Sequence, residues 1–232
     1  MTTPILAAEQ ITKTFNSATV LRGIDLHVAP GEKVAIMGPS GSGKSTFLNC
    51  LAGILTPTSG TVTFQGKVIS SASDAQRSAL RLRDFGFIFQ DSLLIPELPA
   101  RENVALPLRL TGVKTSDALD RADALLHHVG LGEHSHKLPA ELSGGQAQRV
   151  AIARGLVHQP SVVFADEPTG ALDQASGHQA MQLITLTLSH YGGALVLVTH
   201  DTKVARWCDR LVEIRDGFIH SDQTLRCHEE EN

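Results

Sequence analysis

Three short apolar runs, rich in β-branched residues, stand out along the sequence. They are "KVAIMG" at 33–38, "SVVFAD" at 161–166 and "ALVLVTH" at 194–200. Apolar residues fill consecutive positions in each run instead of alternating with polar ones. This pattern is typical of strands buried on both faces of a parallel sheet. Ligands of open α/β folds bind at the carboxyl ends of such strands, so we look for a functional site where these runs end.

Helical periodicity fills the segments between the runs. The stretch 44–55 predicts one apolar helical face, made of Phe47, Leu48, Leu51, Ile54 and Leu55. A second helix is predicted over 116–130, and a third begins after the N-cap residue Asp173. A fourth begins at Ser143, because Gln146 follows at the spacing of a capping box.

Two other segments alternate in polarity and contain hairpin turns. The segment 61–70 turns at Gln65-Gly66, and the segment 211–220 turns at Asp216-Gly217. Antiparallel strands therefore accompany the parallel ones. The pattern predicts an α/β fold.

The length fits one large domain or one domain with a subdomain, and the composition is that of an ordinary globular protein. The chain has 232 residues, of which 42% are hydrophobic and 19% charged. A net charge of -4 argues against nucleic acid as a main partner. No apolar run approaches the about 18 residues that span a bilayer, and "MTTPILAAEQ" lacks the features of a signal peptide. We expect a chain that is soluble on its own and reaches any membrane through a partner.

The cysteines and histidines offer little evidence of a metal or redox site. The three cysteines are far apart in the sequence, which favours structural or incidental thiols in a reduced compartment. The closest histidine groupings are 127–128 and the pair His134 and His136, neither at structural-zinc spacing. We expect these histidines to be solvated surface residues.

The stretch "GPSGSGKST" matches a phosphate-binding loop, G-x-x-x-x-G-K-[ST], over residues 38–45. An apolar strand precedes it and a helix follows it, which is the context that this motif requires. Its glycines let consecutive N–H groups point at an anion, and the helix adds its positive N-terminal end. The residues expected to bind the nucleotide here are Gly38, Ser40, Gly41, Ser42, Gly43, Lys44, Ser45 and Thr46. Among these, Lys44 would contact the β- and γ-phosphates, and the Ser45 hydroxyl would ligate Mg²⁺.

Two adjacent acids end the strand "SVVFADEP". Neighbouring strand residues point to opposite faces, but a turn at the strand end would let both face the nucleotide. Asp166 suits the Mg²⁺ shell, and Glu167 suits a general base that polarises a water towards the γ-phosphate. The alternative is that both acids cap the next turn.

Five elements in order resemble the ABC-type ATPase family. They are the loop 38–45, "FIFQ" ending at Gln90, "LSGGQ" at 142–146, "VVFADEPTGALD", and "VTH" ending at His200. The resemblance covers about residues 15–216. It implies a RecA-like parallel sheet core of the P-loop NTPase type, an antiparallel β subdomain, and a helical subdomain inserted at about 91–150 of a single domain, 1–232.

The resemblance also implies ATP and Mg²⁺ as cofactors and two ATPase subunits that face each other head to tail. Four signature residues would then close over the partner's ATP: Ser143, Gly144, Gly145 and Gln146. The catalytic and metal-sensing roles fall to Gln90, which would sense Mg²⁺ and the attacking water, and to His200, which would contact the γ-phosphate and orient Glu167. Asp173 would cross the dimer interface, and Phe15 would stack on adenine, unless it is an ordinary core residue.

Within the family, "FIFQDSLLIPELPARENV" and "DEPTGALD" resemble the MacB/LolD-like branch, which often has Asn at the position of Ala171. That branch implies two permease subunits and a place on the cytoplasmic face of the membrane, with export or extraction of haem, lipoproteins, drugs or peptides. A permease would dock at 91–110, where the apolar residues are Leu93, Leu94, Ile95, Leu98 and Leu106; each could instead belong to the core of the helical subdomain.

The sequence lacks the features that other classes of nucleotide-binding protein would require. A regulatory GTPase would carry N-K-x-D after a strand, and a small-molecule kinase has no use for "LSGGQ". The main alternative is a regulatory ABC-type ATPase that takes no part in transport. Co-purification with a membrane protein would separate the two interpretations.

Overall fold

The computed structural model describes residues 3–225 of the chain. They form two compact units. The first contains the described residues up to 78 and from 194 onward, and the second contains residues 79–193. Helix α2 (Asp74–Asp84) carries the chain from the first unit into the second. Among the described residues, no helix is both long enough and apolar enough to cross a membrane.

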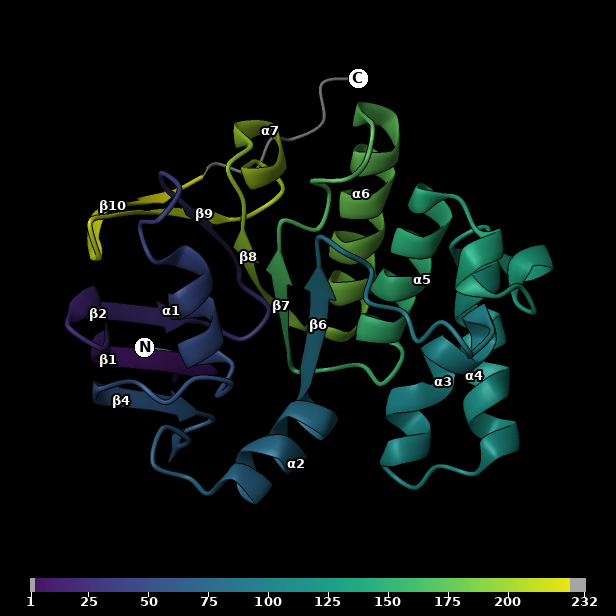
Figure 1. Cartoon of the computed structure of the whole chain (residues 1–232), viewed down its shortest axis with the longest axis horizontal. Coiled ribbons are helices and arrows are strands. Elements are labelled where there is room, and N and C mark those ends of the chain that lie inside the picture. The colour runs from purple at the N-terminus through teal and green to yellow at the C-terminus, as the bar shows by residue number, and fades with distance from the viewer. Residues whose placement is uncertain (1–2, 226–232) are drawn as a thin grey trace. The chain divides into compact units, whose positions relative to one another are not determined.

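The first unit contains an antiparallel sheet, and the alternating segment 61–70 contributes to two of its strands. Its strands are β1 (Leu6–Phe15), β2 (Ala18–Val28), β4 (Ser59–Phe64) and β5 (Lys67–Val68), in the order β2-β1-β4-β5. The turn predicted at residues 65–66 joins β4 to β5, and both of its residues have positive φ, as a two-residue hairpin requires. Figure 1 shows β1, β2 and β4 side by side.

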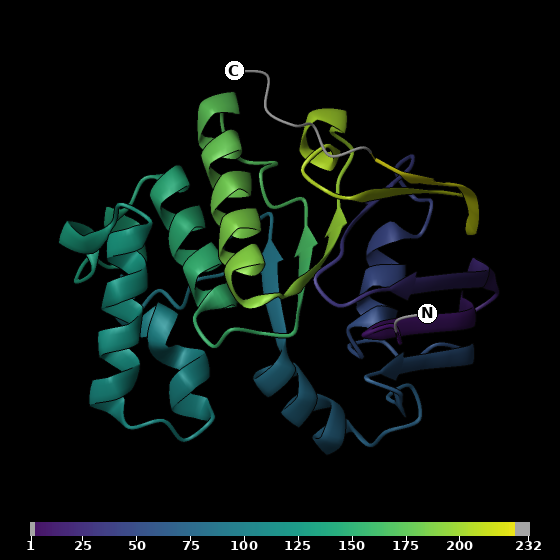
Figure 2. The same cartoon turned by 180° about the vertical axis from the view of Figure 1, so that it is seen from behind.

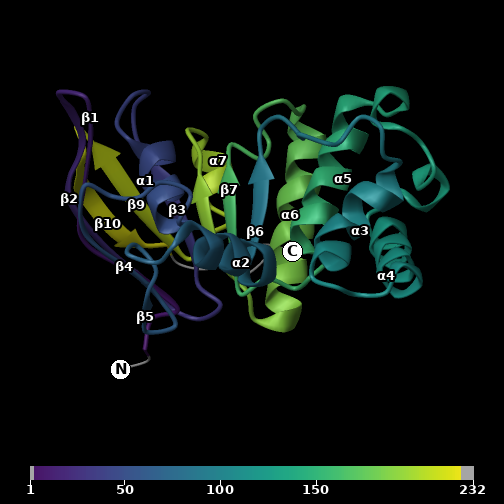
Figure 3. The same ribbon diagram turned by 60° about the horizontal axis from the view of Figure 1, so that its bottom comes forward.

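The same unit contains a second set of strands, in the order β10-β9-β3-β8. Strands β8 (Ala194–Val198) and β9 (Arg210–Arg215) both run parallel to β3 (Lys33–Met37), and β10 (Phe218–Thr224) pairs antiparallel with β9. The turn predicted at Asp216-Gly217 forms this last hairpin, which Figure 3 shows beside β1 and β2. Two of the three apolar runs are therefore neighbouring parallel strands, as predicted.

Helix α1 (Lys44–Leu51) ends earlier than its apolar periodicity predicts. The N–H of Gly53 bonds to Cys50 O, and the N–H of Ile54 bonds to Asn49 O. These two bonds form a Schellman C-cap, which needs Gly53 in its left-handed conformation at φ 63°. The prediction that residues 54 and 55 lie on the helix face is therefore wrong, and the Ile54 side chain is exposed.

The second unit contains two parallel strands, β6 (Phe85–Phe89) and β7 (Val162–Asp166). Helices α5 (Gly144–Leu156) and α6 (Gln174–Tyr191) pack in the same unit, and Figure 2 shows α6 in front of the two strands. Helix α5 begins at its predicted capping box, and α6 begins at its predicted N-cap.

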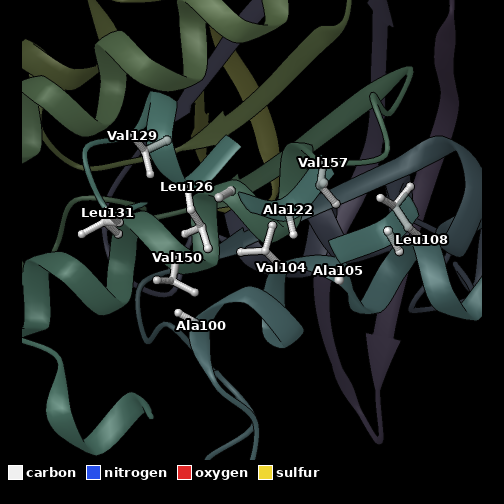
Figure 4. Close-up of a cluster of buried hydrophobic side chains, with 12 residues drawn as sticks. Ala100, Val104, Ala105, Leu108, Ala122, Leu126, Val129, Leu131, Val150 and Val157 are labelled. Carbon is white, nitrogen blue, oxygen red and sulfur yellow. The ribbon is translucent and has the colours of Figure 1, made fainter. Parts of the chain in front are cut away.

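A separate helical core forms from α3 (Ala100–Leu110), α4 (Thr115–His128) and part of α5. The short helical turns η1 (Gly132–His134) and η2 (Pro139–Glu141) connect α4 to α5. The side chains of this core are small and aliphatic, which lets the helices approach closely (Figure 4). The assignment of 91–150 as an inserted subdomain stays a prediction.

The described cysteines are buried within apolar surroundings. Burial raises the pKa of the Cys50 thiol to about 11 and also raises that of Cys208. Both thiols are therefore protonated at neutral pH, as structural cysteines are. Cys227 lies outside the described residues.

Candidate functional site: a phosphate loop and the ends of two strands

The loop between β3 and α1 requires glycine for two different reasons. A Cβ on Gly38 would lie 2.0 Å from the carbonyl oxygen of Ile214, and a Cβ on Gly43 would lie 2.8 Å from Leu21 Cδ2. Gly41 instead faces open space, but its φ of 78° is in the left-handed region. Gly43 is left-handed as well, with φ 97°. Close approach at Gly38 and left-handed backbone at Gly41 and Gly43 thus give the loop its shape.

The loop surrounds a lysine and leads into a helix that no side chain caps. Lys44 Nζ donates hydrogen bonds to Gly38 O at 2.9 Å and to Pro39 O at 2.8 Å. The N-cap residue of α1 is Gly43, which has no side chain to bond the first N–H groups. The buried Ser42 hydroxyl has no hydrogen-bond partner within residues 3–225. A lysine ammonium beside a helix N-terminus that no side chain caps is an anion-binding arrangement.

His200 lies at the same edge of the sheet as the phosphate loop. Ile36 of β3 pairs with Val198 of β8 in the parallel ladder, and Gly38 and His200 each follow their strand partner by two residues. The His200 side chain is exposed. Immediately after it, Asp201 caps α7 (Thr202–Ala205) by accepting a bond from Lys203 N at 2.7 Å. This cap therefore holds the backbone that immediately follows His200 in one conformation.

Phe15 is a surface residue, which excludes the interpretation that it belongs to the core. Its side chain is 43% exposed, and Lys13 Nζ lies 5.0 Å from the ring centroid. Phe15 pairs with Ala18 across the β1–β2 hairpin, and Val20 of the same β2 strand contacts Gly43 of the phosphate loop. One face of an aromatic ring is thus available near this loop.

In the second unit, the acid pair lies where β7 ends and the chain turns. Asp166 is the last residue of the β6–β7 ladder and pairs with Phe89. Glu167 follows with φ 48°, an uncommon conformation for a residue with a side chain, and its carbonyl accepts the Gly170 N–H at 3.0 Å. The turn predicted after the strand is therefore present, and left-handed backbone at Glu167 starts it.

Gln90 follows β6 as Glu167 follows β7, and the side chain of Gln90 packs against the same turn. A Cβ on Gly170 would lie 3.1 Å from Gln90 Cδ. The Gln90 side chain is exposed, so the structure brings an accessible amide next to the segment that carries the acids.

Gln148 is a residue near this turn that the sequence analysis missed. Its side chain is 3% exposed, and its Nε2 donates to Phe89 O at 2.9 Å and to Pro168 O at 2.8 Å. The sequence contained a signal: on α5, Gln148 shares a face with Ala151, Ile152 and Gly155, so an amide occupies a position where an apolar residue is the rule.

The "LSGGQ" segment forms the N-terminal end of α5 and is rigidly capped. Ser143 Oγ accepts the Gln146 N–H at 3.3 Å, and Gln146 Oε1 accepts the Ser143 N–H at 2.9 Å, the reciprocal bonds of a capping box. Gln146 Nε2 also donates to His134 Nε2 at 3.1 Å. The expectation that His134 is a solvated surface residue is therefore wrong, since its ring is half-buried against the signature segment.

Helix α6 begins next to the signature segment. Asp173 Oδ1 accepts the N–H groups of Ala175 and Ser176, and its Oδ2 accepts the Ser176 hydroxyl at 2.6 Å. The bond from the Ser176 hydroxyl is the main cause that lowers the pKa of the Asp173 carboxyl. A Cβ on Gly145 would lie 3.7 Å from Ser176 Oγ, so the starts of α5 and α6 form one surface.

The segment expected to dock a permease exposes one leucine strongly. Leu93 is 61% exposed, with φ 46°, whereas Leu94 packs against the helical core. The buried Asn103 amide holds this segment by bonding the backbone of Ile95 and the carbonyl oxygen of Leu98. Leu94 is therefore partly a core residue, and Leu93 remains the strongest candidate for a contact. Leu98, which precedes helix α3, and Leu106, which lies on it, are both half-buried.

Known families and proteins are similar to this chain over most of its length. The ABC transporter family model matches residues 21–170. The macrolide export ATP-binding/permease protein MacB of Syntrophobacter fumaroxidans is 46% identical over 94% of this chain and 31% of its own length. The lipoprotein-releasing system ATP-binding protein LolD of Hydrogenovibrio crunogenus is 45% identical over 95% of this chain and 98% of its own length. The chain thus spans roughly a third of the MacB relatives that it matches.

A solved structure has the same fold. It is described as the dimeric structure of a post-hydrolysis state of the ATP-binding cassette MJ0796 bound to ADP and Pi. The TM-score is 0.88 at 38% identity, over 95% of this chain and 99% of that one. The α/β fold class predicted from the sequence is thereby confirmed.

Proposed function

Because the chain belongs to the ABC transporter family, we propose that it is the ATP-binding and hydrolysing subunit of a MacB/LolD-type transport system. The observation that carries the proposal is the phosphate loop. Its glycines bring the backbone close to Ile214 and Leu21, it surrounds the Lys44 ammonium, and it leads into a helix without a side-chain cap. These features suit a triphosphate, since the backbone N–H groups and the lysine stabilise its negative charge.

In this proposal, the ATP phosphates bind residues 38–46 and the adenine stacks on Phe15. On binding, Lys44 exchanges its bonds with Gly38 O and Pro39 O for bonds with phosphate oxygens. The 43% exposure of Phe15 supports stacking, because a ring with an open face can accept a base without rearrangement of the core. Ser42, whose hydroxyl is buried, lies close to Gly38, since a Cβ on Gly38 would be 2.9 Å from Ser42 Oγ.

The residues proposed to hold Mg²⁺ are Ser45, Asp166 and Gln90. Ser45 presents an exposed hydroxyl at the first turn of α1, Asp166 presents a carboxylate at the end of β7, and Gln90 presents an exposed amide oxygen. Hard oxygen ligands of this kind fit Mg²⁺. When bound, the ion would neutralise charge on the β- and γ-phosphates.

Glu167 is the proposed general base for the attacking water, with His200 as its partner at the γ-phosphate. The left-handed turn at Glu167 directs the chain away from the line of β7, which supports a role at the strand end instead of within the sheet. A carboxylate can hold the water and accept its proton, and the exposed His200 imidazole can donate a hydrogen bond to phosphate.

Two copies of the chain are proposed to close over ATP, with Ser143, Gly144, Gly145 and Gln146 of one copy against the nucleotide of the other. The solved relative is described as dimeric, and Gly144 faces open space on the capped end of α5. Asp173, at the adjacent start of α6, would lie at this interface. Closure brings a second helix N-terminus to the γ-phosphate.

Two permease subunits are the proposed membrane partners, which place the chain on the cytoplasmic face of the membrane. The names of the relatives support this: one is an ATP-binding/permease protein and the other is the ATP-binding protein of a lipoprotein-releasing system. The exposed Leu93 is the proposed contact for a cytoplasmic helix of the permease.

Glu167→Gln tests the proposal, with Glu9→Gln as the matched control because the Glu9 side chain is exposed on β1. We expect kcat for ATP hydrolysis to fall by about 10²–10⁴-fold in Glu167→Gln, since an amide cannot accept the proton. ATP should still bind and should hold two copies together in size-exclusion chromatography. The control should hydrolyse ATP at the wild-type rate. Normal turnover by Glu167→Gln would refute the role of Glu167.

A further inference from the structure

Helix α5 is fixed closely to strand β6. A Cβ on Gly86 of β6 would lie 2.2 Å from the carbonyl oxygen of Gly155, and a Cβ on Gly155 would lie 2.9 Å from Phe87 O. The two backbones therefore approach as closely as glycine allows. A displacement of α5 along its axis would have to move β6 or break this contact.

The buried Gln148 amide connects α5 to the ends of both strands of this unit. The NH₂ group has two hydrogens, and the two acceptors, Phe89 O and Pro168 O, use both. Phe89 immediately precedes Gln90, and Pro168 immediately follows Glu167. The β6–β7 ladder ends at residues 89 and 166, so the amide continues the connection between the two chains beyond the last backbone pair.

A second side chain of α5 holds the other side of Gln90. Arg154 donates to Leu93 O at 2.7 Å and to Ser92 O at 2.8 Å, and burial lowers the pKa of its guanidinium. The backbone is therefore bonded to one helix on both sides of Gln90. Of these two side chains, it is Gln148 that also bonds the turn that carries Glu167.

We propose that Gln148 is a positioning residue for ATP hydrolysis: its amide sets the separation of the Gln90 and Glu167 backbones and couples both to the signature end of α5. This inference rests on the function proposed above, in which Ser143 contacts the partner's nucleotide. Ser143 and Gln148 are five residues apart on one helix, about 7.5 Å along its axis. Contact between the signature segment and a nucleotide therefore affects the positions of Gln90 and Glu167 through a short, rigid path.

The competing explanation is that Gln148 only fills space in the core. Gln148→Met separates the two, because methionine has a similar length and flexibility but no N–H group. Gln179→Met, on the exposed face of α6, is the matched control. For each full-length variant we would measure the Kd for ATP, the kcat and KM of hydrolysis, and thermal unfolding. All activities are compared below the melting transition of every variant.

We expect Gln148→Met to lower kcat by about tenfold to hundredfold, the usual result of catalytic groups shifted by a fraction of an ångström to one ångström. The Kd for ATP should stay within about threefold, since the phosphate loop is untouched. Gln148→Leu, which is apolar and has no side-chain N–H group, should behave alike and provides the second test if the methionine variant folds poorly. Gln179→Met should match the wild type.

Full kcat in both Gln148 variants would overturn the inference, and so would a loss of ATP affinity equal to the loss of kcat. These results differ from a failure of the proposed function. In that case the wild-type chain would not hydrolyse ATP, or Glu167→Gln would hydrolyse it normally, whatever the Gln148 variants do.

Discussion

Two helices of this chain begin with glycine-rich segments, and the two ends are built in opposite ways. Helix α1 begins after Gly43, which offers no cap, and its Ser42 hydroxyl is buried without a partner in the described part of the chain. Helix α5 begins at Ser143, whose side chain and that of Gln146 satisfy each other's backbone N–H groups. No side chain caps the first N–H groups of α1, whereas those of α5 are capped by side chains of the same segment.

In the proposed function, the difference corresponds to two ways of binding the same anion. An uncapped N-terminus gains the most when a phosphate supplies the missing hydrogen bonds, so the α1 end suits tight binding within one subunit. A capped N-terminus is already rigid and offers an ordered surface, so the α5 end suits a contact that forms and breaks each time two subunits close. The following variants test this contrast, from the largest expected effect to the smallest.

Lys44→Ala should have the largest effect on nucleotide binding. The variant removes the one cation that the loop surrounds, so the ATP affinity should fall by about tenfold to hundredfold, the range for a lost hydrogen bond to a charged group. Isothermal titration with ATP measures the change. Lys67→Ala, at an exposed position of β5, is the control and should bind ATP as the wild type does. Unchanged affinity in Lys44→Ala would remove the phosphate loop from the account.

Gly38→Ala should cost more stability than Gly41→Ala. At Gly41 the new methyl group meets open space, and only the left-handed backbone costs about 1 kcal/mol. At Gly38 it overlaps the Ile214 carbonyl in addition, which adds about 1–3 kcal/mol. Urea unfolding of the two variants measures the difference. Equal losses would mean that close approach does not shape the loop.

Ser143→Ala and Ser42→Ala should separate the two helix ends directly. Loss of the Ser143 cap should cost about 1 kcal/mol of unfolding free energy. Ser42→Ala should cost almost nothing in the nucleotide-free chain, because its hydroxyl has no partner there to lose. Denaturant titration without nucleotide gives both values. A larger loss in Ser42→Ala than in Ser143→Ala would reverse the contrast.

Asp173→Asn should show the smallest effect, and a pH-dependent one. Hydrogen bonds, led by that from the Ser176 hydroxyl, lower the pKa of Asp173 from 3.8 in the folded protein. The carboxylate therefore stabilises the fold fully above the unfolded pKa, and this stabilisation is lost as the pH falls through the folded pKa. The melting temperatures of wild type and Asp173→Asn should differ at pH 7, and they should converge only as the pH falls from the unfolded pKa of about 3.9 through the lower folded pKa. A constant difference across this range would exclude the charged bond as its cause.

The features that the sequence predicts well are local ones. The apolar runs became parallel strands, the Asp-Gly and Gln-Gly turns became hairpins, and the caps at Ser143 and Asp173 formed as expected. In each case, the residues that determine the structure lie within a few positions of one another. The phosphate loop belongs to this class, because its glycines and Lys44 are contiguous.

What could not be predicted depends on contacts between distant segments. Gln148 finds its acceptors at residues 89 and 168, and His134 meets Gln146 through the fold of the connecting turns. The early end of α1 has a different cause. The left-handed Gly53 closes a Schellman cap, which ends the helix although the apolar periodicity continues to residue 55. The buried amide was visible in the sequence as a polar residue on an apolar face, but its partners were not.

The central claim is that the α1 end of one subunit and the α5 end of another bind the same nucleotide. The most direct test mixes two defective proteins, Lys44→Ala and Ser143→Arg. A mixed dimer has one site with both wild-type ends, so ATP hydrolysis should be absent from each protein alone and should return on mixing. If the mixture stays as inactive as its components, although each protein folds, the two ends do not share a nucleotide and the account is contradicted.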